Sequence, residues 1–250
     1  MTPWQGAAVF IAGIAAGTIN TIVGSGSLVT FPTLIALGYP PLVANVSNTV
    51  GLVPGGVSGA LGYRRELEGQ FRRAVALGVV SVFGALLGGI LLLALPESAF
   101  DEIVPALILV AVVLVVLQPT LNGWLARRHG EKDHIGAVLV GAFLCSVYGG
   151  YFGAAQGVII MALLGIFLHD HLQRLNAVKN VSTTVVNLVA ALLFVFVAHV
   201  AWLVSALLAA GSVIGGQIGA KVGRRLPPLA LRVVIVVVGL VAVVKLLFFS

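Results

Sequence analysis

Long apolar stretches alternate along this chain with short polar or basic turns. Six of the apolar stretches have the length of a single membrane span, since a spanning helix needs about 20 mostly apolar residues. The other two contain 34 residues each, which is too long for one span and short for two. The eight stretches are 5–38, 43–63, 74–95, 103–121, 135–168, 177–198, 201–220 and 230–248.

Both 34-residue stretches are interrupted by a glycine-rich patch, at 24–27 and at 149–157. A helix broken inside a membrane leaves backbone groups unpaired, which is tolerated only where the break is buried in protein or lines a polar cavity. The pattern therefore predicts two broken helical hairpins, which either span the membrane or re-enter on the same side.

The composition agrees with a membrane protein and excludes other classes. Hydrophobic residues make up 60% of the chain and charged residues 9%, with a mean hydropathy of +1.14. Soluble domains are about 25% charged, so a soluble globular enzyme is excluded. One cysteine and 31 glycines without a three-residue period exclude disulfide-framework and collagen-like chains. The expected fold class is an all-α polytopic membrane protein.

The net charge of +6 comes from basic clusters between the apolar stretches, which excludes a nucleic-acid surface. Basic residues favour the cytoplasmic side of a membrane. This rule gives a consistent topology in which 13 of the 14 Lys and Arg residues lie on the cytoplasmic side and both termini lie outside. The first stretch lacks a positively charged start, so we expect it to be retained rather than cleaved. The clusters are Arg64, Arg65, Arg72 and Arg73; Arg127, Arg128 and Lys132; Arg174 and Lys179; and Lys221, Arg224, Arg225 and Arg232.

Comparing the sequence with itself at an offset of 131 residues indicates an internal repeat. Gly84 aligns with Gly215, Pro96 with Pro227 and, with one gap, Asn48 with Asn180; Gly26, Ser81 and Gly88 also find identical partners. Together with the charges, this predicts two inverted repeats, each a broken hairpin and three helices, as in many secondary transporters. The first repeat is 1–121, a cytoplasmic basic linker is 122–134, and the second repeat is 135–250.

The second half of each broken hairpin begins with free N–H groups inside the membrane. These groups carry partial positive charge and favour an anion, and glycine lets an oxyanion approach the backbone closely. We therefore predict an anion site between the two hairpin tips. Its expected residues are Asn20, Gly24, Ser25, Gly26, Ser27, Asn48, Thr49, Gln156, Gly157, Lys179, Asn180 and Ser182, with Thr21, Asn45, Ser47, Asn176 and Thr183 as further lining candidates.

Lys179 has two interpretations at this stage. It aligns with Ser47 near the start of a helix, where its ammonium group would face the cavity and neutralise an anion. Alternatively, it is an interface lysine that extends its side chain to cytoplasmic water.

The first hairpin reads Gly13-Ile-Ala-Ala-Gly-Thr-Ile-Asn-Thr-Ile-Val-Gly-Ser-Gly-Ser-Leu-Val-Thr-Phe-Pro-Thr-Leu, and Ala44-Asn-Val-Ser-Asn-Thr follows after a short loop. Over essentially the whole chain this resembles the TauE/SafE sulfite exporter family of the TSUP superfamily. The glycine cluster is thinned to GSGS in the first half and GAAQG in the second. The proline that would match Pro32 is replaced by Leu163.

The resemblance implies an exporter of sulfite, organosulfonates or related small anions in the bacterial cytoplasmic membrane, working by alternating access. A passive anion channel and a small-carboxylate transporter remain alternatives. A different class is an accessory membrane subunit that binds partners through GxxxG faces, which also allow a homodimer. The predicted spans contain no acidic residue. Coupling of transport to protons stays open, and a uniporter driven by the membrane potential fits the sequence equally well.

Catalysis has little support in the sequence, so we expect no enzyme, no cofactor and no metal. Ser25 lies in GSGS and not in the G-x-S-x-G turn of hydrolases, and Cys145 lies in an apolar run where a thiol is inert. His169, Asp170 and His171 are interpreted as a solvated loop rather than a metal site. The expected partners are a small anion and the lipid bilayer.

Overall fold

The computed structural model describes residues 1–127, 134–222 and 228–248 of the protein. In this part the chain forms ten α-helices and no strand. They are α1 (Pro3–Ile22), α2 (Ser27–Ala36), α3 (Pro41–Gly62), α4 (Phe71–Ala94), α5 (Glu97–Arg127), α6 (Ile135–Tyr151), α7 (Gln156–Phe167), α8 (Leu172–Val197), α9 (Trp202–Val222) and α10 (Pro228–Phe248).

The fold is that of an all-α polytopic membrane protein, as the hydropathy pattern predicts. Within the described residues, five helices (α1, α4, α5, α8 and α9) are long and apolar enough to cross a membrane. Large apolar side chains such as Phe196 and Leu203 are exposed on the outside, where lipid rather than water is their favourable environment. Most of the predicted basic linker, 128–133, lies outside the described residues, as do Arg224 and Arg225.

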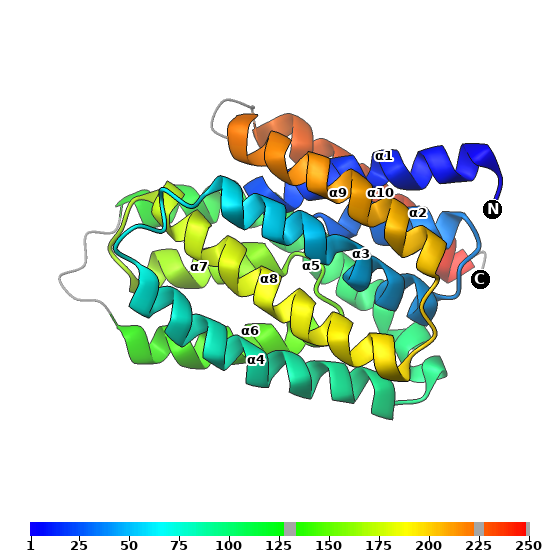
Figure 1. Cartoon of the computed structure of the whole chain (residues 1–250), viewed down its shortest axis with the longest axis horizontal. Coiled ribbons are helices and arrows are strands. Elements are labelled where there is room, and N and C mark those ends of the chain that lie inside the picture. Colours follow the sequence, from blue (N-terminus) through cyan, green and yellow to red (C-terminus); the bar gives the residue numbers. More distant parts are fainter. Residues whose placement is uncertain (128–133, 223–227, 249–250) are drawn as a thin grey trace.

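The two broken hairpins enter from opposite ends of the molecule (Figure 1). Helix α1 begins and α2 ends at the end where the N-terminus lies, and α10 ends there too. The N–H of His134 donates to the carbonyl of Phe167 at 3.0 Å, which joins the start of α6 to the end of α7. The first hairpin thus opens at one end and the second at the other.

Each hairpin packs on helices from the other half of the chain. Helix α1 lies along α9 and α6 lies along α4, while α2 packs on α10 and α7 on α5. Helices α3 and α8 pack against each other and run through the middle of the bundle (Figure 1). Every described helix therefore contributes to one bundle.

The GxxxG faces are used for packing within the chain. A Cβ on Gly88 would lie 2.0 Å from the carbonyl oxygen of Val147, and one on Gly215 would lie 2.1 Å from that of Ile14. Helices approach this closely only where both surfaces carry small residues. Gly51, Gly55, Gly59, Gly84 and Gly219 are likewise covered by side chains or backbone of the same chain.

Helix α5 (Glu97–Arg127) extends six residues beyond each end of the predicted stretch 103–121, and so includes the first part of the predicted linker 122–134. Glu97 lies in its first turn, where a carboxylate interacts favourably with the helix N-terminus. The ends of a helix inside a polar rim are not marked by hydropathy, which explains the six-residue difference.

Candidate functional site

The two hairpin tips meet in the interior, backbone against backbone. The N–H of Gly157 donates a hydrogen bond of 3.0 Å to the carbonyl oxygen of Gly24. A Cβ on either glycine would lie 2.4 Å from the Cα of the other, so no side chain fits at the contact. Sequence analysis predicts both glycines as site residues, and the fold brings them together.

The first tip is shaped by Gly24, whose φ of +87° disfavours every residue with a side chain. Helix α1 ends just before it, and α2 begins at Ser27 after Gly26 as N-cap. The side chain of Ser25 is buried at this turn. The first N–H groups of α2 therefore lie inside the protein, at the depth of the break.

The second tip has a similar path but different residues. Gly153 and Ala155 both have positive φ, of 76° and 57°, and α7 begins at Gln156. Phe152 stacks edge to face on Phe31 of the first hairpin, with ring centres 5.3 Å apart. An aromatic contact thus joins the two hairpins beside the polar tips.

Asn48 of α3 ties the first tip to the centre of the bundle. Its Nδ2 donates to the Ser27 hydroxyl at 3.2 Å, and its Oδ1 accepts a hydrogen bond from the Thr30 hydroxyl. Thr49 instead donates to the carbonyl of Asn45 in its own helix. Of these two predicted residues, Asn48 contacts the hairpin and Thr49 is turned to its own backbone.

Lys179 of α8 is fully buried and binds the carbonyl end of α1. Its Nζ donates to the carbonyls of Asn20 at 3.1 Å and Thr21 at 3.3 Å. The Nδ2 atoms of Asn176 and Asn180 also donate to the Thr21 carbonyl, at 3.2 and 3.3 Å. The C-terminus of a helix carries partial negative charge and stabilises a cation. Lys179 therefore points into the bundle and not to cytoplasmic water.

The second hairpin has the corresponding contact without the positive charge. Asn45 of α3 donates from Nδ2 to the carbonyl of Tyr151 at the end of α6, at 3.0 Å. An amide thus occupies the end of α6, whereas an ammonium group and two amides occupy the end of α1. The site is consequently asymmetric, with its positive charge on the side of the first hairpin.

Three buried polar atoms around the tips have no hydrogen-bond partner among the described residues. They are the Ser25 hydroxyl oxygen, the Gln156 Nε2 and the Asn45 Oδ1, on side chains that are at most 2% exposed. Buried polar groups are nearly always paired with protein, water or ligand. The Ser25 hydroxyl and the Gln156 Nε2 are donors beside helix N-termini and are suited to an oxyanion, whereas the Asn45 Oδ1 can only accept a hydrogen bond.

Ser182 lies in a separate cluster of hydroxyl groups that joins three helices. Its oxygen is 2.9 Å from that of Ser81 on α4, and Ser146 on α6 donates to Ser81 at 3.2 Å. Sequence analysis did not assign Ser81 or Ser146 to the site. Both are hydroxyls inside apolar helices, which are too common to predict a contact, and the repeat aligns Ser81 with Ser212 and not with Ser146 or Ser182.

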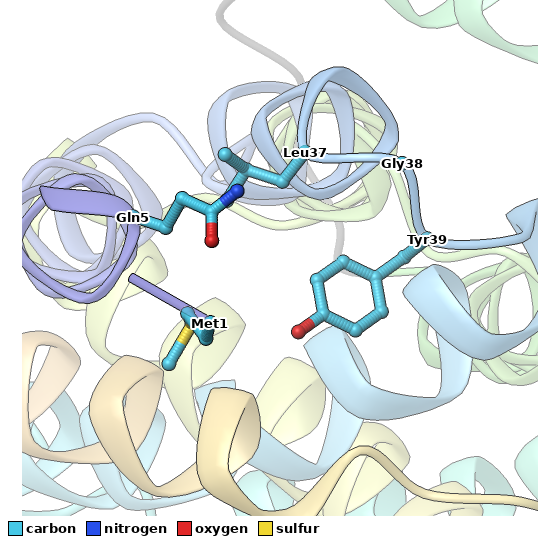
Figure 2. Close-up of a pocket in the computed structure, with 5 residues that line it drawn as sticks. All are labelled: Met1, Gln5, Leu37, Gly38 and Tyr39. Carbon is cyan, nitrogen blue, oxygen red and sulfur yellow. The ribbon is translucent and has the colours of Figure 1, made fainter. Parts of the chain in front are cut away.

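A small cavity of about 160 Å³ lies at the end of the molecule where the first hairpin opens. It is lined by Met1, Gln5, Leu37, Gly38 and Tyr39, and Figure 2 shows the Tyr39 hydroxyl directed toward the space beside Met1. It therefore lies between the start of α1 and the end of α2, at the open end of the first hairpin.

At the opposite end, ion pairs join the loop residue Asp170 to the first turns of α4 and α8. Asp170 accepts from Arg73 at 3.0 Å and from Arg174 at 2.9 Å. The predicted solvated loop thus contains a small salt-bridge network. The side chain of Asp170, which both arginines contact, is only 15% exposed. Among the described residues, no three His, Cys, Asp or Glu side chains gather where they could hold a metal ion.

Comparison with known proteins identifies the family. The profile of the sulfite exporter TauE/SafE family matches residues 9–246. The chain belongs to this family. No solved structure gives a significant match to this TauE/SafE protein.

Curated relatives of this TauE/SafE protein are named as membrane transporters. A Haemophilus influenzae protein, "Probable membrane transporter protein", is 27% identical over 97% of this chain and 94% of its own length. The Sinorhizobium "Probable membrane transporter protein ORF9" is 26% identical over 96% and 91%. The Escherichia coli K12 "Probable membrane transporter protein YfcA" is 25% identical over 97% and 89%. The chain is accordingly a multi-pass membrane protein of a transporter family.

Proposed function

We propose that this protein exports small sulfur-containing anions, such as sulfite or organosulfonates, across the bacterial cytoplasmic membrane. The observation that carries the proposal is the meeting of two broken helices at Gly24 and Gly157, with Lys179 buried beside them. This arrangement offers backbone donors and one positive charge, and among the described residues no acid forms an ion pair with Lys179. An anion is the ligand that such a site favours.

The anion would bind where the tips now touch each other. When the tips separate, the Gly157 N–H exchanges the Gly24 carbonyl for an oxyanion oxygen. The Ser25 hydroxyl and the Gln156 Nε2, which have no hydrogen-bond partner among the described residues, supply further donors. Lys179 leaves the carbonyls of Asn20 and Thr21 in part and neutralises the bound charge. Gly26, Ser27, Asn48 and Asn180 hold these groups in place, whereas Thr49 bonds its own helix and Ser182 lies in the separate hydroxyl cluster.

Transport would follow an alternating-access cycle between two inverted repeats. In the two halves, α1 corresponds to α6, α2 to α7, α4 to α9 and α5 to α10. The α1–α9 contact therefore corresponds to the α6–α4 contact, and the α2–α10 contact to the α7–α5 contact. This exchange supports a repeat of residues 1–121 and 135–250, with opposite directions in the membrane. Direct contact of the tips favours a gated cycle over an open passive channel, because it blocks a continuous pore.

We place both termini outside the cell and the Asp170 network inside. The basic clusters, which include Arg73 and Arg174, then lie on the cytoplasmic side in agreement with the positive-inside rule. The cavity beside Tyr39 would belong to the outer mouth of the first hairpin. The use of the GxxxG glycines for packing within the chain counts against an accessory subunit that binds partners through these faces.

The test is flux through the purified protein in liposomes. Vesicles loaded with sulfite, ethanesulfonate or acetate are followed at fixed pH with an imposed membrane potential. Saturable flux of the two sulfur anions that exceeds that of acetate is expected. Flux of acetate alone would make the protein a carboxylate transporter, and flux that does not saturate would make it a channel. Absence of flux for all three would contradict the transport proposal.

A further inference from the structure

A groove of about 490 Å³ runs along the outside of the bundle between α4 and α8. Its walls are almost wholly apolar, and its volume falls in the range of ligand pockets, about 300–1,000 Å³. The groove does not include the hairpin tips or any residue of the proposed anion site. It is lined by Leu67, Phe71, Ala74, Val75, Gly78, Val79, Val82, Val181 and Val185.

The depth of the groove depends on a glycine in the middle of α4. A Cβ added to Gly78 would meet no other atom within 4 Å, so the space above its backbone is open. Val75 and Val79 stand beside it and are 46% and 52% exposed, while Val181 and Val185 form the opposite wall. A slim apolar chain fits such a slot better than a bulky side chain does.

One end of the groove is rich in arginine. Phe71 lines that end and is 77% exposed, and the neighbouring Arg72 is exposed as well. Arg64 and Arg65 are exposed in the same loop, which leads through Leu67 to the groove. The nearby carboxylate of Asp170 is already shared by Arg73 and Arg174. Residues 64–73 contain four arginines and two glutamates, so a net positive charge remains beside the apolar groove.

We propose that this groove binds one anionic phospholipid, with an acyl chain between α4 and α8 and the phosphate at Arg72, Arg64 and Arg65. Basic sites between membrane helices recognise anionic headgroups by charge, and the aromatic ring of Phe71 suits the interfacial layer. A second copy of the chain fits less well. In one membrane, a two-fold axis along the membrane normal would place the arginine ends of both grooves at the same level, and like charges would then repel.

The lipid would couple two helices that belong to different halves of the chain. Because α4 and α8 form the two walls, an acyl chain between them favours the arrangement in which the groove has its present width. This role does not depend on the identity of the transported anion. It would make the stability of the protein depend on anionic lipid.

The test uses the full-length protein in detergent, with phosphatidylglycerol or phosphatidylcholine of identical acyl chains as probes. Native mass spectrometry counts the lipids retained, and thermal unfolding measures stabilisation. For the unmodified protein we expect one retained phosphatidylglycerol and a larger rise in Tm than with phosphatidylcholine. Arg72→Gln should weaken the preference about fivefold, the effect of one arginine near a charged membrane.

Filling the groove should remove binding of both lipids. Gly78→Leu places a side chain in the middle of the groove, and Val79→Phe places a larger one beside it. If one of the two variants does not fold, the other still tests the proposal. Gly136→Leu is the matched control, since a Cβ at Gly136 also meets nothing within 4 Å. Lys221→Gln controls for loss of an exposed positive charge elsewhere. Lipid retention by both filled variants equal to that of the unmodified protein would overturn the proposal. A dimer that only the filled variants lose would also overturn it.

Discussion

The backbone N–H of Gly157 is bonded to the carbonyl oxygen of Gly24 at 3.0 Å, across 133 residues of sequence. This bond joins the tips of two broken helices that enter the bundle from opposite ends (Figure 1). It also occupies a donor at the start of α7 that an anion would use. The structure therefore corresponds to a closed arrangement of the candidate site.

A methyl group at this contact should block both packing and transport. In Gly24→Ala the new Cβ would lie 2.4 Å from the Gly157 Cα, at a φ of +87°. Strain and overpacking of this kind cost about 1–3 kcal/mol each. We expect a lower Tm in detergent and loss of sulfite flux. Gly136→Ala is the control, and wild-type flux in Gly24→Ala would contradict a tight contact of the tips during the cycle.

Removing the buried ammonium group should separate function from stability. Lys179→Met keeps the length of the side chain but removes the charge that binds Asn20 and Thr21. Desolvation makes a buried charge costly, so the free energy of unfolding should stay within about 1 kcal/mol of the unmodified value. Sulfite flux should fall about tenfold or more, the effect of losing one charged hydrogen bond. A folded variant with full flux would show that Lys179 has only a structural role.

The unpartnered hydroxyl at the first tip should matter for the ligand and not for the fold. Ser25→Ala removes an oxygen that has no hydrogen-bond partner in the described part of the chain, so Tm should not fall. The KM for the anion should rise about three- to tenfold, the value of one hydrogen bond.

Ser58→Ala is the matched control for Ser25→Ala. The Ser58 hydroxyl donates to the carbonyl of Val213 at 2.9 Å and accepts from Gln217. Here stability should fall by about 1 kcal/mol with KM unchanged. The reverse pattern in the two serine variants would remove Ser25 from the anion site.

Cysteine labelling checks the direction of each half in the membrane. In a Cys145→Ala background, single cysteines at Pro40, Ser98 and His199 should react with an impermeant thiol reagent added outside intact cells. Cysteines at Glu68 and Leu172 should react only after the cells are opened. All five positions are exposed, so lack of reaction reports the side of the membrane. Labelling of positions 40 and 172 from the same side would contradict the inverted repeat.

Several elements of the fold could be predicted because their signals are local. Each of the eight apolar stretches contains a helix, and both glycine patches coincide with a break, at 23–26 and 152–155. Apolar length and glycine act within a few residues, so the sequence carries them directly. The same local logic placed Gly24, Ser25, Gln156 and Gly157 at the tips.

Other features depended on residues 65 or more positions apart in the sequence. Nothing in the neighbourhood of Lys179 indicates that its ammonium group binds the carbonyls of Asn20 and Thr21. Likewise, a serine in an apolar helix does not show that Ser81, Ser146 and Ser182 meet. Such partners are decided by which helix faces pack together, and many faces of an apolar helix have similar hydropathy.

The sequence by itself determined that this chain is a helical membrane protein with two broken helices and a basic side, since length, hydropathy and charge are properties of single segments. The tertiary structure decided that the two breaks touch and that the buried lysine binds the end of α1. It also decided that the GxxxG glycines serve packing within the chain. Side-chain partners follow from close packing across the whole bundle, where a shift of one helical turn would exchange them all.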